Sequence, residues 1–236
     1  MLFQPFSPWI HLWTLAPRNL LSSRWAWKCL DETEKESLTG LTPASQENAA
    51  IKRAQIKTIL ARYNELSPAE VHFHHNRFGK PFFGRYAFSI AHTGQKTILG
   101  ISNLSALGTD LEDLRKKTEI EHFASRFTEE ELHGIASSSE EAYQKALAIL
   151  WVRKEAVLKA VGVGLHEDLR TIKVSHKQSQ PLSYRINREK NIFSQWSTPL
   201  FVDGNFLFTL AYPCSSSDPP RMPKITFTRF DPEKIL

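Results

Sequence analysis

The chain has 236 residues, 41% of them hydrophobic and 23% charged, so it is long enough and apolar enough to bury a substantial core. Its 30 Lys and Arg against 25 Asp and Glu leave a net charge of +5, which suggests an anionic partner such as nucleic acid, a phosphorylated cofactor or an acidic protein. No apolar run approaches the roughly 18–20 residues that span a bilayer, which argues against a membrane-embedded protein.

The N-terminal part of the chain alternates predicted strands with helices. An acid-rich start predicts a short helix over 31–38, and Pro43 opens a longer helix over 45–63. Thr93-Gly94-Gln95 is typical of a hairpin turn between two strands. The predicted strands of this part are 9–15, 71–75, 86–91, 96–102 and 107–111.

In the C-terminal part, helices precede a run of strands. Thr128 followed by three acids marks a helix start, and a long helix over 140–161 ends at Gly162. Residues 203–205 are typical of a hairpin turn. The predicted strands of this part are 171–175, 183–186, 199–202, 206–212 and 225–230. The C-terminal half is therefore a helical segment followed by a sheet.

The long helix carries a polar face. Trp151, Glu155 and Lys159 follow at intervals of four residues, so they share one side of the helix. Glu155 and Lys159 have the spacing of an ordinary solvent-exposed ion pair, which contributes only about 0.2–0.5 kcal/mol to a helix. Trp151 one turn earlier indicates instead that this face is partly covered and lies near a cleft.

Two carboxylates lie on the predicted strand 107–111 or directly after it. Asp110 and Glu112 are two residues apart and therefore point to the same face of a strand. Two carboxylates about 4 Å apart repel by about 4 kcal/mol at an effective dielectric constant near 20. Mg²⁺ offsets such repulsion and commonly takes one or two protein carboxylates. The alternative is an exposed strand end with two independently solvated acids.

Basic residues and histidines complete the candidate groups. Arg53 and Lys57 share a helix face that either binds an anion or simply faces water. His92 and Thr93 lie at a strand end, where binding groups commonly project. His72, His74 and His75 invite a metal assignment, but a short strand would place the first two on its exposed face.

The order of these motifs resembles that of the 4'-phosphopantetheinyl transferases, specifically their long, surfactin-type class. The resemblance runs from about Arg53 to Leu165 and is most specific over 108–112 and 151–165. It implies two similar α+β halves related by a pseudo-two-fold axis, here 1–108 and 109–236, with coenzyme A between them. It also implies a monomer that moves the phosphopantetheine arm to a serine of an acyl or peptidyl carrier protein.

The resemblance carries over residue by residue. It implies that Asp110, Glu112 and Glu155 bind Mg²⁺ and that Lys159 contacts phosphate. Lys159 and a base, either Glu155 or Glu112, would be the catalytic groups. The residues that it implies for coenzyme A binding are Arg53, Lys57, Gly79, Lys80, Pro81, His92, Thr93 and Lys159.

Three positions depart from the family pattern. Ala91 stands where many relatives have serine, so Thr93 alone would supply a hydroxyl beside His92. Thr109 replaces an aliphatic residue, and Arg153 replaces an uncharged one. The departure at Ala91 bears on affinity for coenzyme A, whereas the other two remove no catalytic group.

Two other functions were weighed against the transferase. A non-catalytic basic module for an anionic partner predicts clustered Lys and Arg with exposed aromatics, but the cations here are scattered and nucleic acid is not expected. A Mg²⁺-dependent phosphohydrolase would use the same acids without a carrier. Cys29 and Cys214 show no disulfide or zinc spacing, and no signal peptide is evident, so we expect a cytoplasmic protein.

Overall fold

The computed structural model describes residues 7–116, 124–136, 139–187, 192–214 and 222–235. Within them the helices are α1 (Ser23–Cys29), α2 (Glu32–Glu36), α3 (Pro43–Asn64), α5 (Glu129–Ile135), α6 (Glu140–Val161) and α7 (Pro232–Ile235). The strands are β1 (Trp9–Thr14), β2 (His74–His75), β3 (Pro81–Phe82), β4 (Ala87–Thr93), β5 (Lys96–Ser102), β6 (Gly108–Asp113), β7 (Ile172–Lys173), β8 (Leu182–Asn187), β9 (Ile192–Ser197), β10 (Leu200–Asp203), β11 (Phe206–Pro213) and β12 (Lys224–Arg229).

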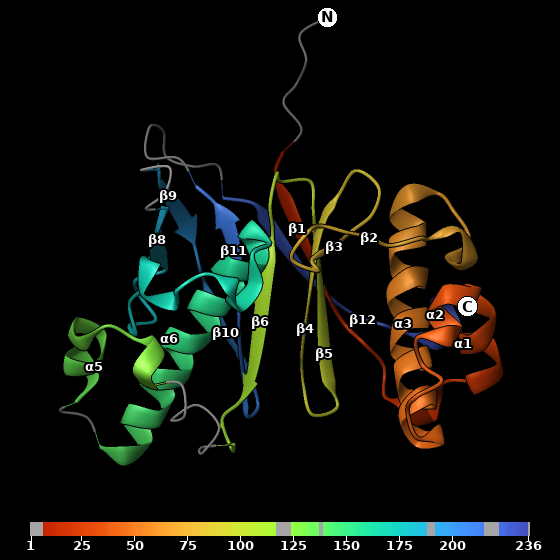
Figure 1. Cartoon of the computed structure of the whole chain (residues 1–236), viewed down its shortest axis with the longest axis horizontal. Coiled ribbons are helices and arrows are strands. Elements are labelled where there is room, and N and C mark those ends of the chain that lie inside the picture. The colour runs from red at the N-terminus through yellow and green to blue at the C-terminus, as the bar shows by residue number, and fades with distance from the viewer. Residues whose placement is uncertain (1–6, 117–123, 137–138, 188–191, 215–221, 236) are drawn as a thin grey trace, which may run out of the picture.

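Two sheets lie face to face between two long helices (Figure 1). The N-terminal sheet has the strand order β12-β1-β5-β4, and the C-terminal sheet has the order β10-β11-β9-β8-β7 with β6 paired to β11. Their shared core includes Leu12 and Ala91 from one sheet and Leu111 and Leu210 from the other. The α+β fold class is therefore confirmed.

Each long helix covers the outer face of one sheet. Ile59 and Leu60 of α3 pack with Leu99 of the N-terminal sheet. Leu147 of α6 packs with Leu207 of the C-terminal sheet in a separate core. The two halves thus repeat one arrangement, a sheet with a long helix on its outer face.

Helix capping explains where the long helices begin and end. Ser139 caps α6 by accepting a hydrogen bond from Ala142 N, and Thr42 does the same for α3 through Ser45 N. Gly162 ends α6 in the left-handed conformation at φ 81°, which glycine adopts without steric cost. The predicted helix over 140–161 is confirmed with the same limits.

The structure corrects several predicted elements. The strand predicted over 71–75 is only β2, because Val71 leaves a short 3₁₀ turn and packs into the core of the N-terminal half. The strand predicted over 171–175 is reduced to β7. The sequence pattern did not predict α1, which packs against α3, or β9, which pairs with β8.

The C-terminal strand β12 crosses between the halves. It pairs in parallel with β1, with Trp9 opposite Lys224, and so extends the N-terminal sheet. The last strand of the chain thus belongs to the N-terminal sheet. Among the described residues, no helix combines the length and the apolar character needed to cross a membrane.

Candidate active site

A close approach of backbone places β6 against α6. Gly108 is the reason, because a Cβ atom at this position would lie 1.8 Å from Ala156 O and 2.5 Å from Ala160 N of the helix. Gly108 begins β6, so the strand runs along the helix from this contact. Residues two and four positions further along β6 point to the same side as residue 108. The glycine thus brings that side of the strand to the polar face of α6.

Two contacts join the strand acids to this helix face. Lys159 Nζ lies 2.6 Å from Asp110 Oδ1, and Trp151 Nε1 lies 3.2 Å from Glu112 Oε1. Glu155 occupies the helix turn between Trp151 and Lys159. The structure therefore brings together all three acids and the lysine of the predicted site, in a partly buried position.

The electrostatics of the group centre on Glu155. Burial raises its pKa to about 7, and the carboxylates of Asp110 and Glu112 act in the same direction against the attraction of Lys159. Burial alone would lower the pKa of Lys159, but Asp110 beside it raises the value above its ordinary level. The three acids thus outnumber the two cations that act on Glu155, Lys159 and Arg126.

Two buried carboxylate oxygens of the group, Asp110 Oδ2 and Glu155 Oε1, have no hydrogen-bond partner in the described part of the chain. In the same part, no three His, Cys, Asp or Glu side chains are grouped so as to hold a metal ion. Surplus negative charge and orphaned carboxylate oxygens are what a hard cation such as Mg²⁺ satisfies. The donor types of Asp110, Glu112 and Glu155 therefore suit Mg²⁺, whereas their side chains are not grouped as a three-residue metal site in this structure.

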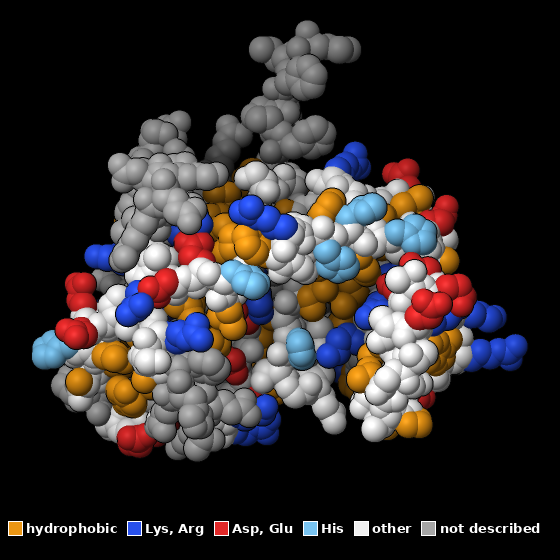
Figure 2. All heavy atoms as spheres, in the orientation of Figure 1, with side chains coloured by type: hydrophobic (Ala, Val, Ile, Leu, Met, Phe, Trp, Pro, Cys, Tyr) orange, Lys and Arg blue, Asp and Glu red, His pale blue; other side chains and the backbone are white. Residues whose placement is uncertain are grey.

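A pocket of about 250 Å³ lies next to Lys159 at the boundary between the halves. The turn between β2 and β3 forms one side of it, and β4 forms another. The residues that line it include Gly79, Lys80, Pro81, Ser89, Lys159 and Gly162. Figure 2 shows this face of the molecule hollowed between its two halves, with Lys, Arg and His side chains around the hollow.

The β2–β3 turn is fastened to the end of α6. Asn76 Nδ2 donates to Gly162 O at 2.7 Å, and Lys80 Nζ donates to Ala160 O at 2.9 Å and to Leu107 O at 3.2 Å. A Cβ at Gly162 would come within 2.9 Å of both side chains. The ammonium of Lys80 therefore joins the halves, and the backbone around it lines the pocket.

His92 and its two neighbours point to opposite faces of β4. His92 is exposed, whereas Ala91 and Thr93 are buried. The charges of Lys159 and Asp110 act on the pKa of His92, so the histidine belongs to the same electrostatic group. Ala91 packs between the two sheets. The hydroxyl expected from Thr93 therefore does not lie on the face of His92.

The structure corrects the expectation that Lys57 faces water, and it pairs both Lys57 and Arg53 with Glu34. Lys57 is fully buried and its Nζ lies 2.6 Å from Glu34 Oε2. Arg53 donates to Glu34 O and to Ser37 Oγ, both at 3.1 Å. Lys57 is therefore held inside the N-terminal half, whereas the side chain of Arg53 stays 32% exposed.

Sequence reasoning missed the roles of several basic residues. Lys154 is fully buried, pairs with Glu131 at 2.8 Å and donates to backbone carbonyls of the segment after α6. Arg153 is also buried and donates to Thr198 O at 3.2 Å. Lys52 acts electrostatically on His92, although no motif singled it out. The residue spacing of α3 does not show that Lys52, rather than a residue next to it, acts on His92.

Comparison with known proteins identifies the segment that carries the acids. Residues 106–211 match the family model described as the 4'-phosphopantetheinyl transferase superfamily. The matched segment is similar to a domain of this superfamily. Asp110, Glu112, Glu155 and Lys159 all lie within the matched segment. This match and the relatives named below support a transferase enzyme.

Three relatives bear the same description. The 4'-phosphopantetheinyl transferase HetI of Nostoc sp. is 28% identical over 182 residues, which cover 73% of this chain and 76% of the relative. A putative 4'-phosphopantetheinyl transferase of Synechocystis sp. is 29% identical over 55% of each chain. The transferase gsp of Aneurinibacillus migulanus is 25% identical over 58% of this chain and 57% of its own.

Proposed function

We propose that the protein transfers the 4'-phosphopantetheine arm of coenzyme A to a serine of an acyl or peptidyl carrier protein. The serine oxygen forms a bond to the phosphorus that bears pantetheine, and the bond from this phosphorus to the pyrophosphate bridging oxygen breaks. The serine gives up its proton, and the leaving group is adenosine 3',5'-bisphosphate. No oxidant or further co-reactant is required.

One juxtaposition supports the proposal most strongly. The Lys159 ammonium contacts Asp110 at 2.6 Å and also lines the pocket formed with Gly79 to Pro81. A cation that lies next to carboxylates and also lines a pocket suits a substrate that has a pyrophosphate joined to an adenosine. Lys159 would offset negative charge on a phosphate oxygen as the bond breaks.

Mg²⁺ is part of this proposal. Asp110, Glu112 and Glu155 would hold it, because two of their oxygens are buried without partners and their charges repel one another. When bound, the ion would neutralise pyrophosphate charge and so make the bisphosphate a better leaving group.

The serine proton requires a base among the same acids. Glu155, with its pKa raised to about 7, is suited to accept a proton near neutral pH. Glu112 is the alternative base, oriented by Trp151 through its Oε1 atom. The proton would pass to one of these carboxylates directly or through water.

The partners follow from the same chemistry. Coenzyme A is anionic and carrier proteins of this kind are acidic, so the +5 charge of this chain would favour encounter with both. Both cysteines are free thiols, as expected in a reducing cytoplasm. We further propose that the enzyme acts as a monomer in fatty acid or secondary metabolite biosynthesis.

Intact-mass measurement of carrier proteins tests the proposal. A mixture of acyl and peptidyl carriers would be incubated with the enzyme, coenzyme A and Mg²⁺, with and without a chelator. We expect a chelator-sensitive mass gain of one phosphopantetheine arm, lost when the carrier serine is replaced by alanine. Release of free phosphopantetheine without a carrier would indicate a phosphohydrolase instead. Binding of coenzyme A without any mass gain would indicate a non-catalytic module.

A further inference from the structure

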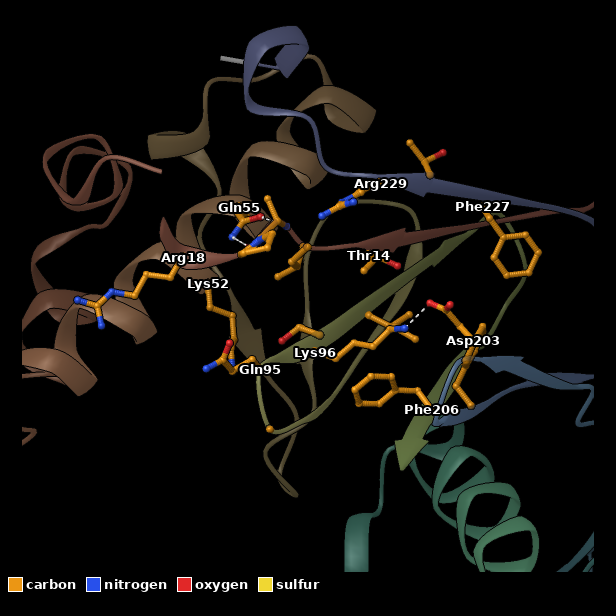
Figure 3. A pocket seen from close by; sticks show the side chains of 18 of the residues that line it. Thr14, Arg18, Lys52, Gln55, Gln95, Lys96, Asp203, Phe206, Phe227 and Arg229 are labelled. Carbon is orange, nitrogen blue, oxygen red and sulfur yellow. Dashed lines mark hydrogen bonds and ion pairs between the residues drawn. The ribbon is translucent and has the colours of Figure 1, made fainter. Parts of the chain in front are cut away.

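Two cavities of the described structure differ in what they adjoin. The larger, of about 1800 Å³, lies where α3, the β4–β5 turn, β12 and the β10–β11 turn meet (Figure 3). The described residues that line it include neither Lys159 nor any of the three acids. Lys159 lines the pocket of about 250 Å³, which the β2–β3 turn closes on one side. The position of this turn therefore sets the shape of the space beside Lys159.

The β2–β3 turn has little secondary structure of its own to hold it. β2 and β3 have two residues each and form a separate two-stranded sheet. Such a hairpin is at best marginally stable by itself. Phe73 and Phe83 anchor its base in the core of the N-terminal half, whereas Gly79 at its tip is exposed. The tip therefore depends on contacts outside its own strands.

Asn76 makes such contacts with a single side-chain amide. Its Oδ1 accepts from Phe78 N and from Lys80 N, both at 2.9 Å, and so fixes the conformation of the turn. Its Nδ2 donates to Gly162 O at 2.7 Å, across to the end of α6. Lys159 belongs to the last turn of the same helix. The amide thus links the turn to the helix end that carries this ammonium.

Two further contacts hold the turn at the same place. The Lys80 ammonium donates to carbonyl oxygens at the end of α6 and just before β6, and the Phe78 ring lies 5.5 Å from the ring of His166. Gly162 permits the close approach, because a Cβ there would lie 2.9 Å from Asn76 Nδ2. Among these groups, Asn76 is the one whose side chain binds both the turn backbone and the helix end.

Asn76 acts on the pocket from outside it. The pocket is lined by Gly79 to Pro81 on the side of the turn and by Lys159 and Gly162 on the side of the helix, and Asn76 is not among its lining residues. A ligand that contacts both sides binds more tightly when the two sides are already in place, because less ordering is needed on binding. The amide supplies this preorganisation.

Building on the proposed function, we propose that Asn76 is a positioning residue for coenzyme A, which holds the β2–β3 turn against the end of α6 and so preorganises the pocket beside Lys159. The resemblance implied that Gly79, Lys80 and Pro81 bind coenzyme A. Alignment of that segment thus falls to a residue outside it. Loss of Asn76 should weaken binding of coenzyme A and leave the rate at saturation unchanged, since the acids and Lys159 stay in place.

Steady-state kinetics with varied coenzyme A, at saturating carrier and Mg²⁺, and calorimetric titration of coenzyme A together test the inference. We expect Asn76→Ala to raise both KM and Kd for coenzyme A on the order of tenfold, the effect of losing neutral hydrogen bonds that order the site. The kcat and the KM for the carrier should not change. Asn76→Ser keeps a short acceptor for the turn but does not reach Gly162 O, so it should weaken binding while losing less stability.

Asn103→Ala is the matched control. Asn103 also joins two backbone segments, because its Oδ1 accepts from Trp9 N at 2.9 Å and its Nδ2 donates to Ser7 O at 3.2 Å. It lies between β5 and β6 and lines neither of the two cavities. Loss of this amide should lower the melting temperature and leave KM and Kd for coenzyme A unchanged.

Each other outcome has a distinct meaning. Unchanged KM and Kd in Asn76→Ala would overturn the inference, as would a similar rise in Asn103→Ala. A fall of kcat at unchanged KM would also overturn it, because it would indicate loss of folded enzyme. If Asn76→Ala does not fold, Asn76→Ser provides the same comparison.

The two proposals fail separately. If the wild type binds coenzyme A but modifies no carrier, the proposed function fails, and calorimetry alone decides the role of Asn76. If the wild type modifies a carrier and both Asn76 variants keep its KM for coenzyme A, only the inference fails. If the wild type neither binds coenzyme A nor modifies a carrier, both fail.

Discussion

The indole N–H of Trp151 donates to Glu112 Oε1 at 3.2 Å and so ties an acid of β6 to α6, one helix turn from Glu155. Trp151 is only 8% exposed and packs in the core of the C-terminal half. Its ring therefore has one fixed position, and the N–H orients Glu112 with little loss of side-chain freedom. Trp151 is a positioning residue for the acid.

Replacing Trp151 by phenylalanine keeps an aromatic ring and removes this donor. A hydrogen bond to a charged group contributes about 1.5–3 kcal/mol, so kcat/KM for carrier modification should fall on the order of tenfold. The Mg²⁺ concentration for half-maximal rate should rise, which a purely structural role would not cause. Trp196→Phe is the control, because that buried indole donates to Ser194 in β9. Equal effects in the two variants would refute the positioning role.

Replacing Glu155 by glutamine should lower the transfer rate without lowering the stability of the fold. The rate of transfer should fall by at least about 10²-fold, the usual contribution of a positioned base. The melting temperature should hold or rise, because the change removes a buried charge repelled by Asp110 and Glu112. Glu141→Gln, at an exposed position in the first turn of the same helix, should alter neither property. Near-normal turnover of Glu155→Gln would contradict the assignment.

Local regularities made part of this site predictable from the sequence. The two-residue spacing of Asp110 and Glu112 fixes their common side on a strand, and the four-residue spacing of Glu155 and Lys159 fixes their common side on a helix. Gly162 marks the helix end by its backbone conformation. These features depend on neighbours in the chain, and the described structure has the predicted helix and strand at these positions.

Features that depend on distant segments were not predictable. The period of α3 places Arg53 and Lys57 on one side, but it does not reveal that Glu34 approaches that side. Lys52 is next to Arg53 in sequence, and only the position of β4 brings it toward His92. From the sequence, Ala91 lacks a hydroxyl that the site was expected to use. In the structure Ala91 is a core residue packed between the two sheets.

Lys57→Met tests the structural role of that lysine against the predicted phosphate role. Removing one partner of a buried ion pair costs about 3–5 kcal/mol, so urea unfolding should show a loss of that size. Affinity for coenzyme A should not change under conditions that keep the protein folded. Adding Glu34→Gln should recover part of the stability, since glutamine keeps the capping box of α2. If the Lys57→Met variant bound coenzyme A more weakly but had unchanged stability, the predicted phosphate contact of Lys57 would be supported instead.

Gly108→Ala should disrupt the contact between β6 and α6. The added Cβ would meet backbone atoms of α6, which cannot move aside as a side chain can, so we expect a loss of at least about 3 kcal/mol in unfolding free energy. Gly134→Ala is the contrasting change, because its Cβ meets nothing closer than 4.0 Å inside α5. That variant should gain about 0.5–1 kcal/mol from helix propensity. Similar stability of both variants would contradict the close approach.

Lys80 gives the stability a dependence on pH that can be isolated. Its ammonium donates to Ala160 O and Leu107 O, and burial lowers its pKa to about 8 from the ordinary value of 10.5. Below pH 8 the folded and unfolded chains both carry the proton, so this group adds no pH dependence there. Between pH 8 and 10.5 the unfolded chain binds more protons than the folded one, and the free energy of unfolding rises with pH.

Lys80→Met should remove this rise, because methionine keeps an apolar stem and does not titrate. We expect the difference in unfolding free energy between wild type and variant to increase from pH 8 to 10.5 and to stay level from pH 6 to 8. Other titrating groups are common to both proteins and cancel in the difference. Lys28→Met, at an exposed position of α1, should retain the slope of the wild type. A constant difference across the range would show that Lys80 is not held in a desolvated contact between the halves.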